Sequence, residues 1–368
     1  MTGADYFSPT YAVAAERFRG RCRDAAAVTE HHVHPAARGP GGEPLATDVA
    51  RFGSPDCEAV LIVVSGVHGI EGFAGSACQL AFMDHAVRGL GDPPGAIVFV
   101  HALNPSGFAH WRRVNEDNVD LNRNFVDHTR PPPANPLYAA LHPPLLLLPS
   151  WSASDRAAAE RQLGDVVRSA GVRAVQTAIT SGQYTHADGL FYGGRAPVWS
   201  NRLWRELVQR HVANARQVAV VDIHTGLGTH GEAEIIFRGR RDAPSIERAR
   251  LWYGPRMTIS EDGTSSSTEI DGNTPRAVED AMQDGELTAI TMELGTLPPR
   301  EVLDALRADH WIARAPAAQV TDELRAEARR QMTAAFCPEA RGWRDTVVQR
   351  GIDVLQTAWS GLFGRQPG

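Results

Sequence analysis

Apolar runs and amphipathic segments alternate along the first part of the chain. Residues 8–27 place Ala, Val, Phe and Arg at helical spacing, which predicts a helix. Short segments at 48–52 and 59–64 predict strands, and apolar residues across 75–87 predict a buried helix before another strand at 96–100. Because strand, loop, helix and strand in this order form a βαβ unit, the pattern predicts an α/β fold.

Two continuous apolar strands follow in the second half of the chain. Residues 217–221 and 287–292 are apolar without interruption or nearly so, as in parallel strands that helices cover on both faces. The chain from Arg300 onward is predicted to be mostly helical. Further predicted helices span 154–170, 199–211 and 346–363, the last with an apolar stripe along one face.

Proline is concentrated in residues 131–149, which we expect to form an inserted loop or flap without regular structure. The whole chain is long enough for one large α/β domain. The apolar stripe of the last predicted helix fits two arrangements: packing on its own body, which we favour, or packing on another subunit in a homo-oligomer.

Charge and composition exclude several classes of protein. The 368 residues carry a net charge of −6, with acidic and basic residues interspersed, so we expect no nucleic-acid partner. All 37 basic residues are arginine. The absence of lysine excludes Schiff-base chemistry, anchoring of pyridoxal phosphate and the lysine of phosphate-binding loops.

Cysteine usage and the N-terminal residues suggest a reducing compartment. Four cysteines are scattered without a C-x-x-C pair, which argues against a disulfide framework or a thiolate zinc site. No basic segment followed by an apolar one begins the chain, and the aliphatic run Leu145 to Leu148 is too short to cross a bilayer. We therefore expect a cytoplasmic protein without a membrane partner. The cysteines are Cys22, Cys57, Cys78 and Cys337.

Three predicted strands end in groups that could bind a metal or act in catalysis. His68 and Glu71 follow the strand 59–64, while His224 and Glu293 follow the later apolar strands. The carboxyl ends of strands in an open α/β sheet face one crevice, so these groups are expected to meet there. Two histidines and one glutamate suit a catalytic zinc ion with a fourth position left open, and a further carboxylate could act as the base.

Other polar groups could serve the same crevice. Arg112 and Arg113 are adjacent guanidinium groups, and Asn122 with Arg123 offers an amide beside another; arginine binds carboxylates in a two-pronged geometry. Asp222 lies two residues before His224 on the same side of the strand and could orient it. The histidines 31, 32 and 34 are expected in a solvated loop rather than in a second metal site.

Six motifs in order resemble the zinc carboxypeptidase family, in particular a bacterial branch near aspartoacylase and succinylglutamate desuccinylase. The resemblance implies a mixed, mostly parallel sheet flanked by helices on both faces, forming a single catalytic domain over 1–368 with a helical extension from about 300. The motifs are Gly66 to Glu71, Asn104-Pro105-Ser106-Gly107, Arg113-Val114-Asn115, Asp120-Leu121-Asn122-Arg123-Asn124-Phe125, Asp222-Ile223-His224-Thr225-Gly226 and Met292-Glu293-Leu294-Gly295.

The same resemblance implies roles for individual residues. It implies one Zn²⁺ held by His68, Glu71 and His224, and Glu293 as general base and acid. Asn122 and Arg123 would grip a substrate carboxylate, and Arg113, or its neighbour Arg112, would stabilise the oxyanion. A substrate-capping tyrosine is less defined: Tyr253 is the tyrosine between His224 and Glu293, and Tyr184 lies in a loop that either borders the pocket or forms a turn.

We therefore expect a zinc metallohydrolase that cleaves an amide bond next to a free carboxylate in a small peptide. An N-acyl amino acid deacylase is the alternative within enzymes. A metal-binding protein that kept the fold without turnover is the alternative outside them. The polar run Thr264 to Thr268 is either a rim of the cleft or plain surface.

Overall fold

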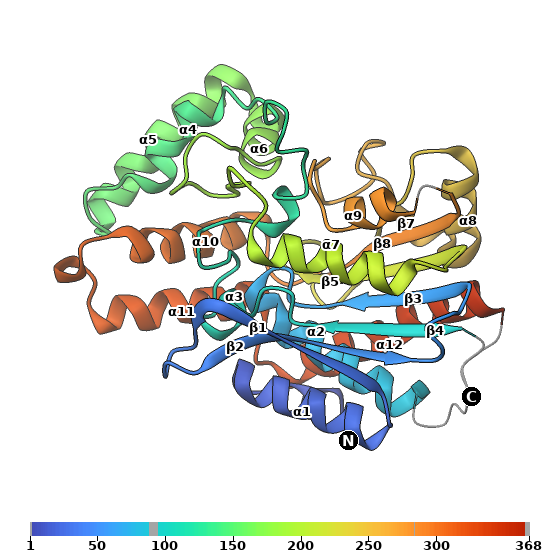
Figure 1. Ribbon diagram of the computed structural model, residues 1–368. Helices are drawn as coiled ribbons and strands as arrows, with labels where there is room; N and C mark the ends of the chain where they lie inside the picture. The colour runs from blue at the N-terminus through green and yellow to red at the C-terminus, as the bar shows by residue number, and fades with distance from the viewer. Residues whose placement is uncertain (1, 88–94, 283, 365–368) are drawn as a thin grey trace.

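A mixed eight-stranded sheet organises the computed structural model, which describes residues 2–87, 95–282 and 284–364. Its strand order is β1-β2-β4-β3-β5-β8-β6-β7 (Figure 1). The inner strands β4, β3, β5 and β8 run parallel, whereas β1, β2 and β6 join by antiparallel pairing. The predicted α/β class with a mostly parallel mixed sheet is confirmed. The strands are β1 Val28–Arg38, β2 Pro44–Phe52, β3 Ala59–Val64, β4 Ala96–His101, β5 Gln217–Thr225, β6 Ala233–Phe237, β7 Met257–Thr258 and β8 Glu286–Leu294.

Helices cover both faces of the sheet, as the continuous apolar strands predicted. Leu61 and Val63 of β3 pack into a core with α1, α2 and α12, whereas Ile62 and Val64 pack into a second core with α7 and α9. Figure 1 shows α1 below the sheet and α7 above it. These helices are α1 Tyr11–Asp24, α2 Gly72–Phe82, α7 Trp199–Val212, α9 Pro275–Ala281 and α12 Arg341–Phe363.

The prediction of a solvated loop for His31, His32 and His34 is wrong, because all three lie on β1. An edge strand pairs on one side only, so it does not need the apolar pattern of an inner strand. Pro35 lies in the irregular part of the ladder between residues 33 and 38, where strand proline is tolerated. The three histidines contact different carboxylates, Asp48 at 2.6 Å, Glu30 at 2.9 Å and Glu116 at 2.9 Å, so they do not converge on one point.

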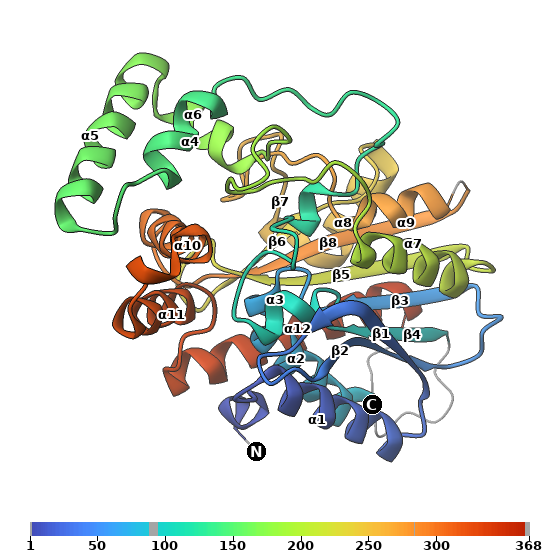
Figure 2. The ribbon, with the colours of Figure 1, turned by 60° about the vertical axis from the view of Figure 1, so that its left-hand side comes forward.

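The prediction that 131–149 lack regular structure is also wrong, because α4 spans Tyr138–Leu146. Tyr138, Leu141 and Leu145 are fully buried, and their burial outweighs the hydrogen bonds lost at the two prolines inside the helix. Figure 2 shows α4 grouped with α5 (Ala153–Ala170) and α6 (Val172–Thr180) on one side of the molecule, beside α10 (Pro299–Arg314).

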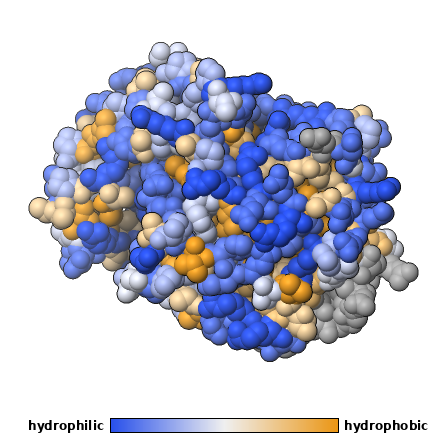
Figure 3. All heavy atoms as spheres, in the orientation of Figure 1, coloured by the Kyte–Doolittle hydropathy of each residue, from blue (hydrophilic) through white to orange (hydrophobic). Residues whose placement is uncertain are grey.

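The chain after Arg300 is mostly helical, as predicted, and α12 packs on its own body through Val347, Ile352 and Leu355. Among the described residues, no helix is both long and apolar enough to cross a membrane. The face in Figure 3 is mostly hydrophilic, with apolar residues in small separate groups. The remaining helices are α3 Pro105–Ala109, α8 Ala243–Tyr253 and α11 Asp322–Phe336, with short helical turns at Gly3–Tyr6, Gly69–Glu71, Met83–Val87, Leu121–Arg123, Gly254–Arg256 and Ala317–Gln319.

Candidate active site

The parallel strands β3, β5 and β8 bring the predicted groups to one edge of the sheet. His224 pairs in register with Glu293 on the neighbouring strand, so the two residues lie side by side at the carboxyl ends of β5 and β8. His68 and Glu71 follow β3, which is the other neighbour of β5. The convergence expected from the strand pattern is therefore confirmed.

A tight loop between β3 and α2 holds His68 and Glu71. The backbone N–H of Gly69 donates to the carbonyl of Arg113 at 3.0 Å, which ties the loop to the segment after α3. A Cβ atom on Gly69 would lie 2.0 Å from the backbone of Gly107, so the close approach requires glycine. The turn Gly69–Glu71 then places the carboxylate of Glu71 next to the ring of His68.

His68, Glu71 and His224 form a compact, buried set of possible metal ligands. The Nδ1 atoms of the two rings lie 3.1 Å apart, and the oxygens of Glu71 lie 3.0 Å from the first and 2.8 Å from the second. One donor atom from each residue falls within 4.8 Å of the others. Two imidazole nitrogens and one carboxylate oxygen match the donor types and number of a catalytic zinc site.

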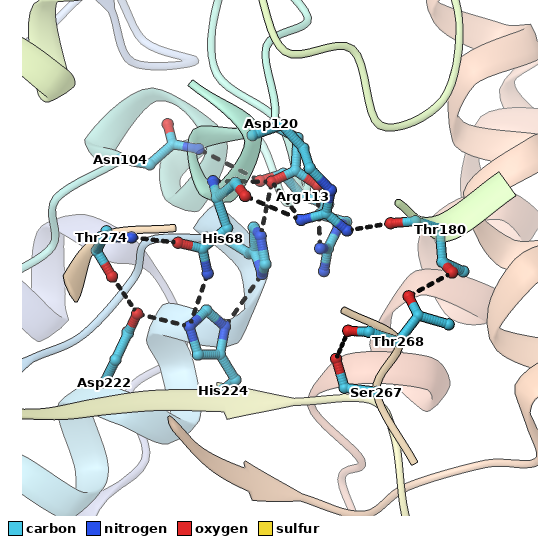
Figure 4. Close-up of polar contacts among 12 residues, drawn as sticks. His68, Asn104, Arg113, Asp120, Thr180, Asp222, His224, Ser267, Thr268 and Thr274 are labelled. Atoms are coloured by element: carbon cyan, nitrogen blue, oxygen red, sulfur yellow. Dashed lines mark hydrogen bonds and ion pairs between the residues drawn. The ribbon is translucent and has the colours of Figure 1, made fainter. Parts of the chain in front are cut away.

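The far nitrogen of each ring is held by a buried carboxylate (Figure 4). Nε2 of His68 lies 3.0 Å from Asp120, and Nε2 of His224 lies 2.9 Å from Asp222. A proton on Nε2 leaves the lone pair of Nδ1 directed at the common point, which is how carboxylates orient ligating histidines. The expected orienting role of Asp222 is matched by this contact, whereas the equivalent contact of Asp120 is not evident from the sequence.

Charged neighbours keep Asp120 and Glu71 ionised. Burial alone would raise the pKa of Asp120, but Arg113, His68 and Arg123 lower it well below its usual range. The pKa of Glu71 is likewise lowered, because the charges and hydrogen bonds of His68 and His224 outweigh the effect of burial. Glu71 and Asp120 are therefore anionic at neutral pH.

Glu293 has a different environment. Burial and the nearby negative charge of Glu71 raise the pKa of Glu293 to about 7. One oxygen accepts a hydrogen bond from the backbone N–H of Leu227 at 3.0 Å, which fixes the carboxylate. Among the described residues it forms no ion pair. A carboxyl group poised near neutrality can both take and return a proton.

The structure separates the two adjacent arginines. Arg113 lies in the site, where it donates to Glu71 at 2.8 Å and to Asp120 at 3.1 Å. Arg112 points elsewhere and donates to Asp309 at 3.0 Å. Arg113 therefore contacts a possible metal ligand, whereas Arg112 does not.

Asn122 and Arg123 lie beside the ligands. The amide nitrogen of Asn122 is 3.2 Å from His224, and Arg123 donates to the carbonyl of Thr180 at the end of α6. Tyr184 does not line the cavity; its hydroxyl donates to the backbone carbonyl of Arg123 at 2.6 Å and supports it from behind. The same loop instead borders the cavity through Phe191, whose ring lies 5.4 Å from the guanidinium of Arg123.

Tyr253 is not part of this site. It ends α8 and is buried in the apolar core, away from the residues that line the cavity. Arg238 is a cavity residue that the sequence pattern does not reveal. It follows β6 and donates to Ser260 at 3.1 Å and Ser267 at 3.0 Å, while burial and the charge of Arg123 lower its pKa to about 10, so it stays charged at neutral pH.

A cavity of about 380 Å³ joins these groups to a mainly apolar wall. His68, His224 and Glu293 line one end. Residues from α5, α6 and α10 line the other, together with Phe336 of α11. The run Thr264 to Thr268 contributes Ser266, Ser267 and Thr268, which favours the cleft-rim interpretation of that run.

Solved structures similar to the chain include a carboxypeptidase, a fibrinolysis inhibitor and an amidase. Carboxypeptidase A from Helicoverpa armigera shares 12% identity at a TM-score of 0.45, over 95% of this chain and 74% of that chain. Bovine thrombin-activatable fibrinolysis inhibitor shares 12% at 0.46, over 95% and 98%. Murein-tripeptide amidase MpaA from Escherichia coli O157 shares 20% at 0.38, over 77% and 91%.

No curated protein matches the sequence. One family, described as "Protein of unknown function (DUF2817)", matches residues 7–350, which is nearly the whole chain. The match includes every residue of the cavity and of the buried ligand set. The chain therefore belongs to the DUF2817 family.

Proposed function

We propose that the protein is a zinc-dependent hydrolase that cleaves an amide bond next to a free carboxylate. The observation that carries this proposal is the pairing of a buried His-Glu-His ligand set with a separate buried glutamate of raised pKa in the same cavity. A structural zinc site has four protein ligands and no need of such a base, whereas a catalytic site keeps a position open.

The proposed metal ligands are Nδ1 of His68, the carboxylate of Glu71 and Nδ1 of His224. Both rings are already orientated by Asp120 and Asp222, so the donor atoms converge without rearrangement of the backbone. A bound zinc ion would polarise the scissile carbonyl and make the attacking water more acidic.

Glu293 takes the proton of the attacking water and later gives it to the leaving nitrogen. Burial and the charge of Glu71 raise the pKa of Glu293 above its usual value, which favours uptake and return of a proton near neutral pH. Arg113 stabilises the negative charge that develops on the carbonyl oxygen. Its Nε–H has no hydrogen-bond partner among the described residues.

Charge in the cavity favours a substrate with a carboxylate. Four arginines line it, and Arg300 is paired with Glu160 and Asp304 on the helices, which leaves the guanidinium groups of Arg113, Arg123 and Arg238 near the ligand set. Together with a bound divalent cation, the positive charges of these three groups exceed the negative charges of Glu71, Asp120, Asp222 and Glu293. Arg123 and Asn122 therefore bind the substrate carboxylate, in a small peptide or in an N-acyl amino acid.

Metal analysis and hydrolysis of a substrate panel test the proposal. We expect about one zinc per chain in the wild type, loss of zinc in His224→Ala, and retention of zinc without turnover in Glu293→Gln. His32→Ala is the matched control, because His32 contacts only an outlying carboxylate, and it should keep both zinc and activity.

The panel pairs dipeptides with N-acyl amino acids of the same terminal residue. Preference for one set separates a peptidase from a deacylase. Zinc binding without turnover on either set, unaffected by Glu293→Gln, would instead identify a metal-binding protein without this activity. A wild type without metal would refute the proposal.

A further inference from the structure

Two helices outside the sheet present an apolar face to the cavity. Val172, Val175 and Ile179 of α6 recur at the spacing of one helix face, and all three line the cavity. Leu163 and Val167 of α5 extend the same surface. This wall comes from the segment that follows the proline-rich region, not from the strands that carry the ligands.

The opposite wall is apolar as well. Pro299, Val302, Leu303 and Leu306, all near the start of α10, face the cavity. Phe336 at the end of α11 adds an aromatic ring. The cavity therefore has a polar end at the ligand set and an apolar chamber between α5, α6 and α10.

The chamber is continuous with the proposed binding site for the substrate carboxylate at Asn122 and Arg123. Arg123 donates to the carbonyl of Thr180, which directly follows Ile179 of the apolar wall. A cavity of roughly 150 Å³ lined by apolar side chains accommodates benzene. The 380 Å³ available here therefore has room for a polar head group and a substantially larger apolar group.

Val172 shows that the chamber opens to solvent. It lines the cavity, yet 70% of its surface is exposed. Exposing an apolar side chain beside other apolar side chains is unfavourable unless something covers them. A ligand that enters at this point would cover Val172.

We propose, building on the proposed function, that the substrate is amphipathic and carries a large apolar group that fills the chamber between α5, α6 and α10. The substrate class is thus long-chain N-acyl amino acids or peptides with a large apolar residue at the scissile bond. Because burial of each methylene contributes a roughly constant increment, kcat/KM should rise about fourfold per added methylene until the chamber is full.

Two substrate series test this proposal. One varies the acyl chain from acetyl to dodecanoyl on a fixed amino acid, and the other varies the amino acid side chain from alanine to phenylalanine under a fixed acetyl group. A steep rise of kcat/KM in one series supports the proposal and shows which side of the amide enters the chamber. Turnover that is independent of size in both series refutes it and leaves the hydrolase function intact.

Variants localise the effect. Val175→Trp fills the chamber and should lower kcat/KM for long substrates at least tenfold more than for short ones. Val172→Gln alters only the entrance of the chamber, and because Val172 is exposed the substitution should not disturb folding. It should lower kcat/KM for long substrates severalfold. Leu251→Gln is the matched control, since Leu251 is 83% exposed on α8 and does not line this cavity.

Binding gives a readout that does not depend on cleavage. Calorimetry of fatty acids from hexanoate to dodecanoate with Glu293→Gln should show affinity that increases with chain length and decreases in Val175→Trp. If this dependence is found but no amide is cleaved, the chamber is confirmed and the hydrolase function fails. Equal binding of all chain lengths refutes the chamber.

Discussion

Replacing Asp120 by asparagine tests how the site depends on the carboxylate behind its first histidine. Both oxygens of Asp120 are used: one is 3.0 Å from Nε2 of His68 and 3.0 Å from the backbone N–H of Asn122, and the other accepts from Arg113 at 3.1 Å. An asparagine of the same shape keeps one acceptor and places an NH₂ group where the other acceptor stood. Either His68 or Arg113 then faces a donor.

The expected loss follows from these contacts. A hydrogen bond to a charged group contributes about 1.5–3 kcal/mol, and loss of a carboxylate behind a ligating histidine weakens metal binding about 10–100-fold. Arg113 would keep only Glu71 as a charged partner and would compete more strongly with zinc for that ligand. We therefore expect Asp120→Asn to lower zinc affinity by the same factor of about 10–100.

Asp222→Asn is the matched control at the second histidine. One oxygen of Asp222 accepts from His224 and from Thr274, but the other has no hydrogen-bond partner among the described residues. An asparagine can turn its NH₂ toward the unpartnered side and keep its oxygen on His224. Its effect on zinc affinity should stay below about tenfold.

Zinc affinity is measured by competition with a chromophoric chelator, and kcat/KM is measured again at saturating zinc. Excess zinc should restore Asp222→Asn, but Asp120→Asn should remain impaired because Arg113 loses its ion pair with Asp120. Equal losses in the two variants, or a larger loss in Asp222→Asn, would refute the reasoning from individual oxygen atoms.

Three further predictions concern the loop, the pH dependence and the arginine pair. Gly69→Ala puts a Cβ atom 2.0 Å from the α3 backbone, so it should lower the free energy of unfolding by about 1–3 kcal/mol and release zinc. Gly342→Ala, whose Cβ atom would have no neighbour within 4 Å, should do neither. Equal melting temperatures of the two variants would contradict this reasoning. Burial lowers the pKa of His101 to about 4 in the folded protein, from about 6.5 in the unfolded chain. Its contribution of about 3 kcal/mol to the free energy of unfolding is therefore present above pH 6.5 and is lost as the pH falls toward 4. Urea unfolding across this pH range should show the loss of stability, and His101→Gln should reduce it. Arg113→Lys should lower kcat about 100-fold and Arg112→Lys should not, and similar kcat values would argue against Arg113 as the oxyanion group.

The parts of the site on strand ends could be predicted from the sequence. Parallel inner strands are recognisable because both faces are buried, and their carboxyl ends face one crevice, so His68, Glu71, His224 and Glu293 could be brought together without knowledge of the register. The choice between Arg112 and Arg113 could not be made in this way, because it depends on which direction each side chain takes after a short turn.

The structure of segments that depend on tertiary packing, and not on a regular apolar pattern, could not be predicted from the sequence. β1 is an edge strand whose histidines satisfy separate carboxylates, so its pattern resembles a loop. α4 could not be predicted because it contains two prolines, although its buried leucines stabilise the helix. Arg238 follows β6, an antiparallel strand without a distinctive sequence motif. Tyr253 is distinguished in the sequence only by its position between His224 and Glu293, and its side chain is buried in the core.

Chemistry and specificity are therefore expected to come from different parts of this chain. The ligand set, Glu293 and Arg113 are positioned by the sheet and by loops tied to it, so substitutions there should change metal binding and kcat. The apolar chamber is lined by α5, α6 and α10, which carry none of the proposed metal ligands. Substitutions in those helices should change which amides are cleaved while zinc content stays constant, and the strongest test of the division is that Val175→Trp and Asp120→Asn act independently when combined.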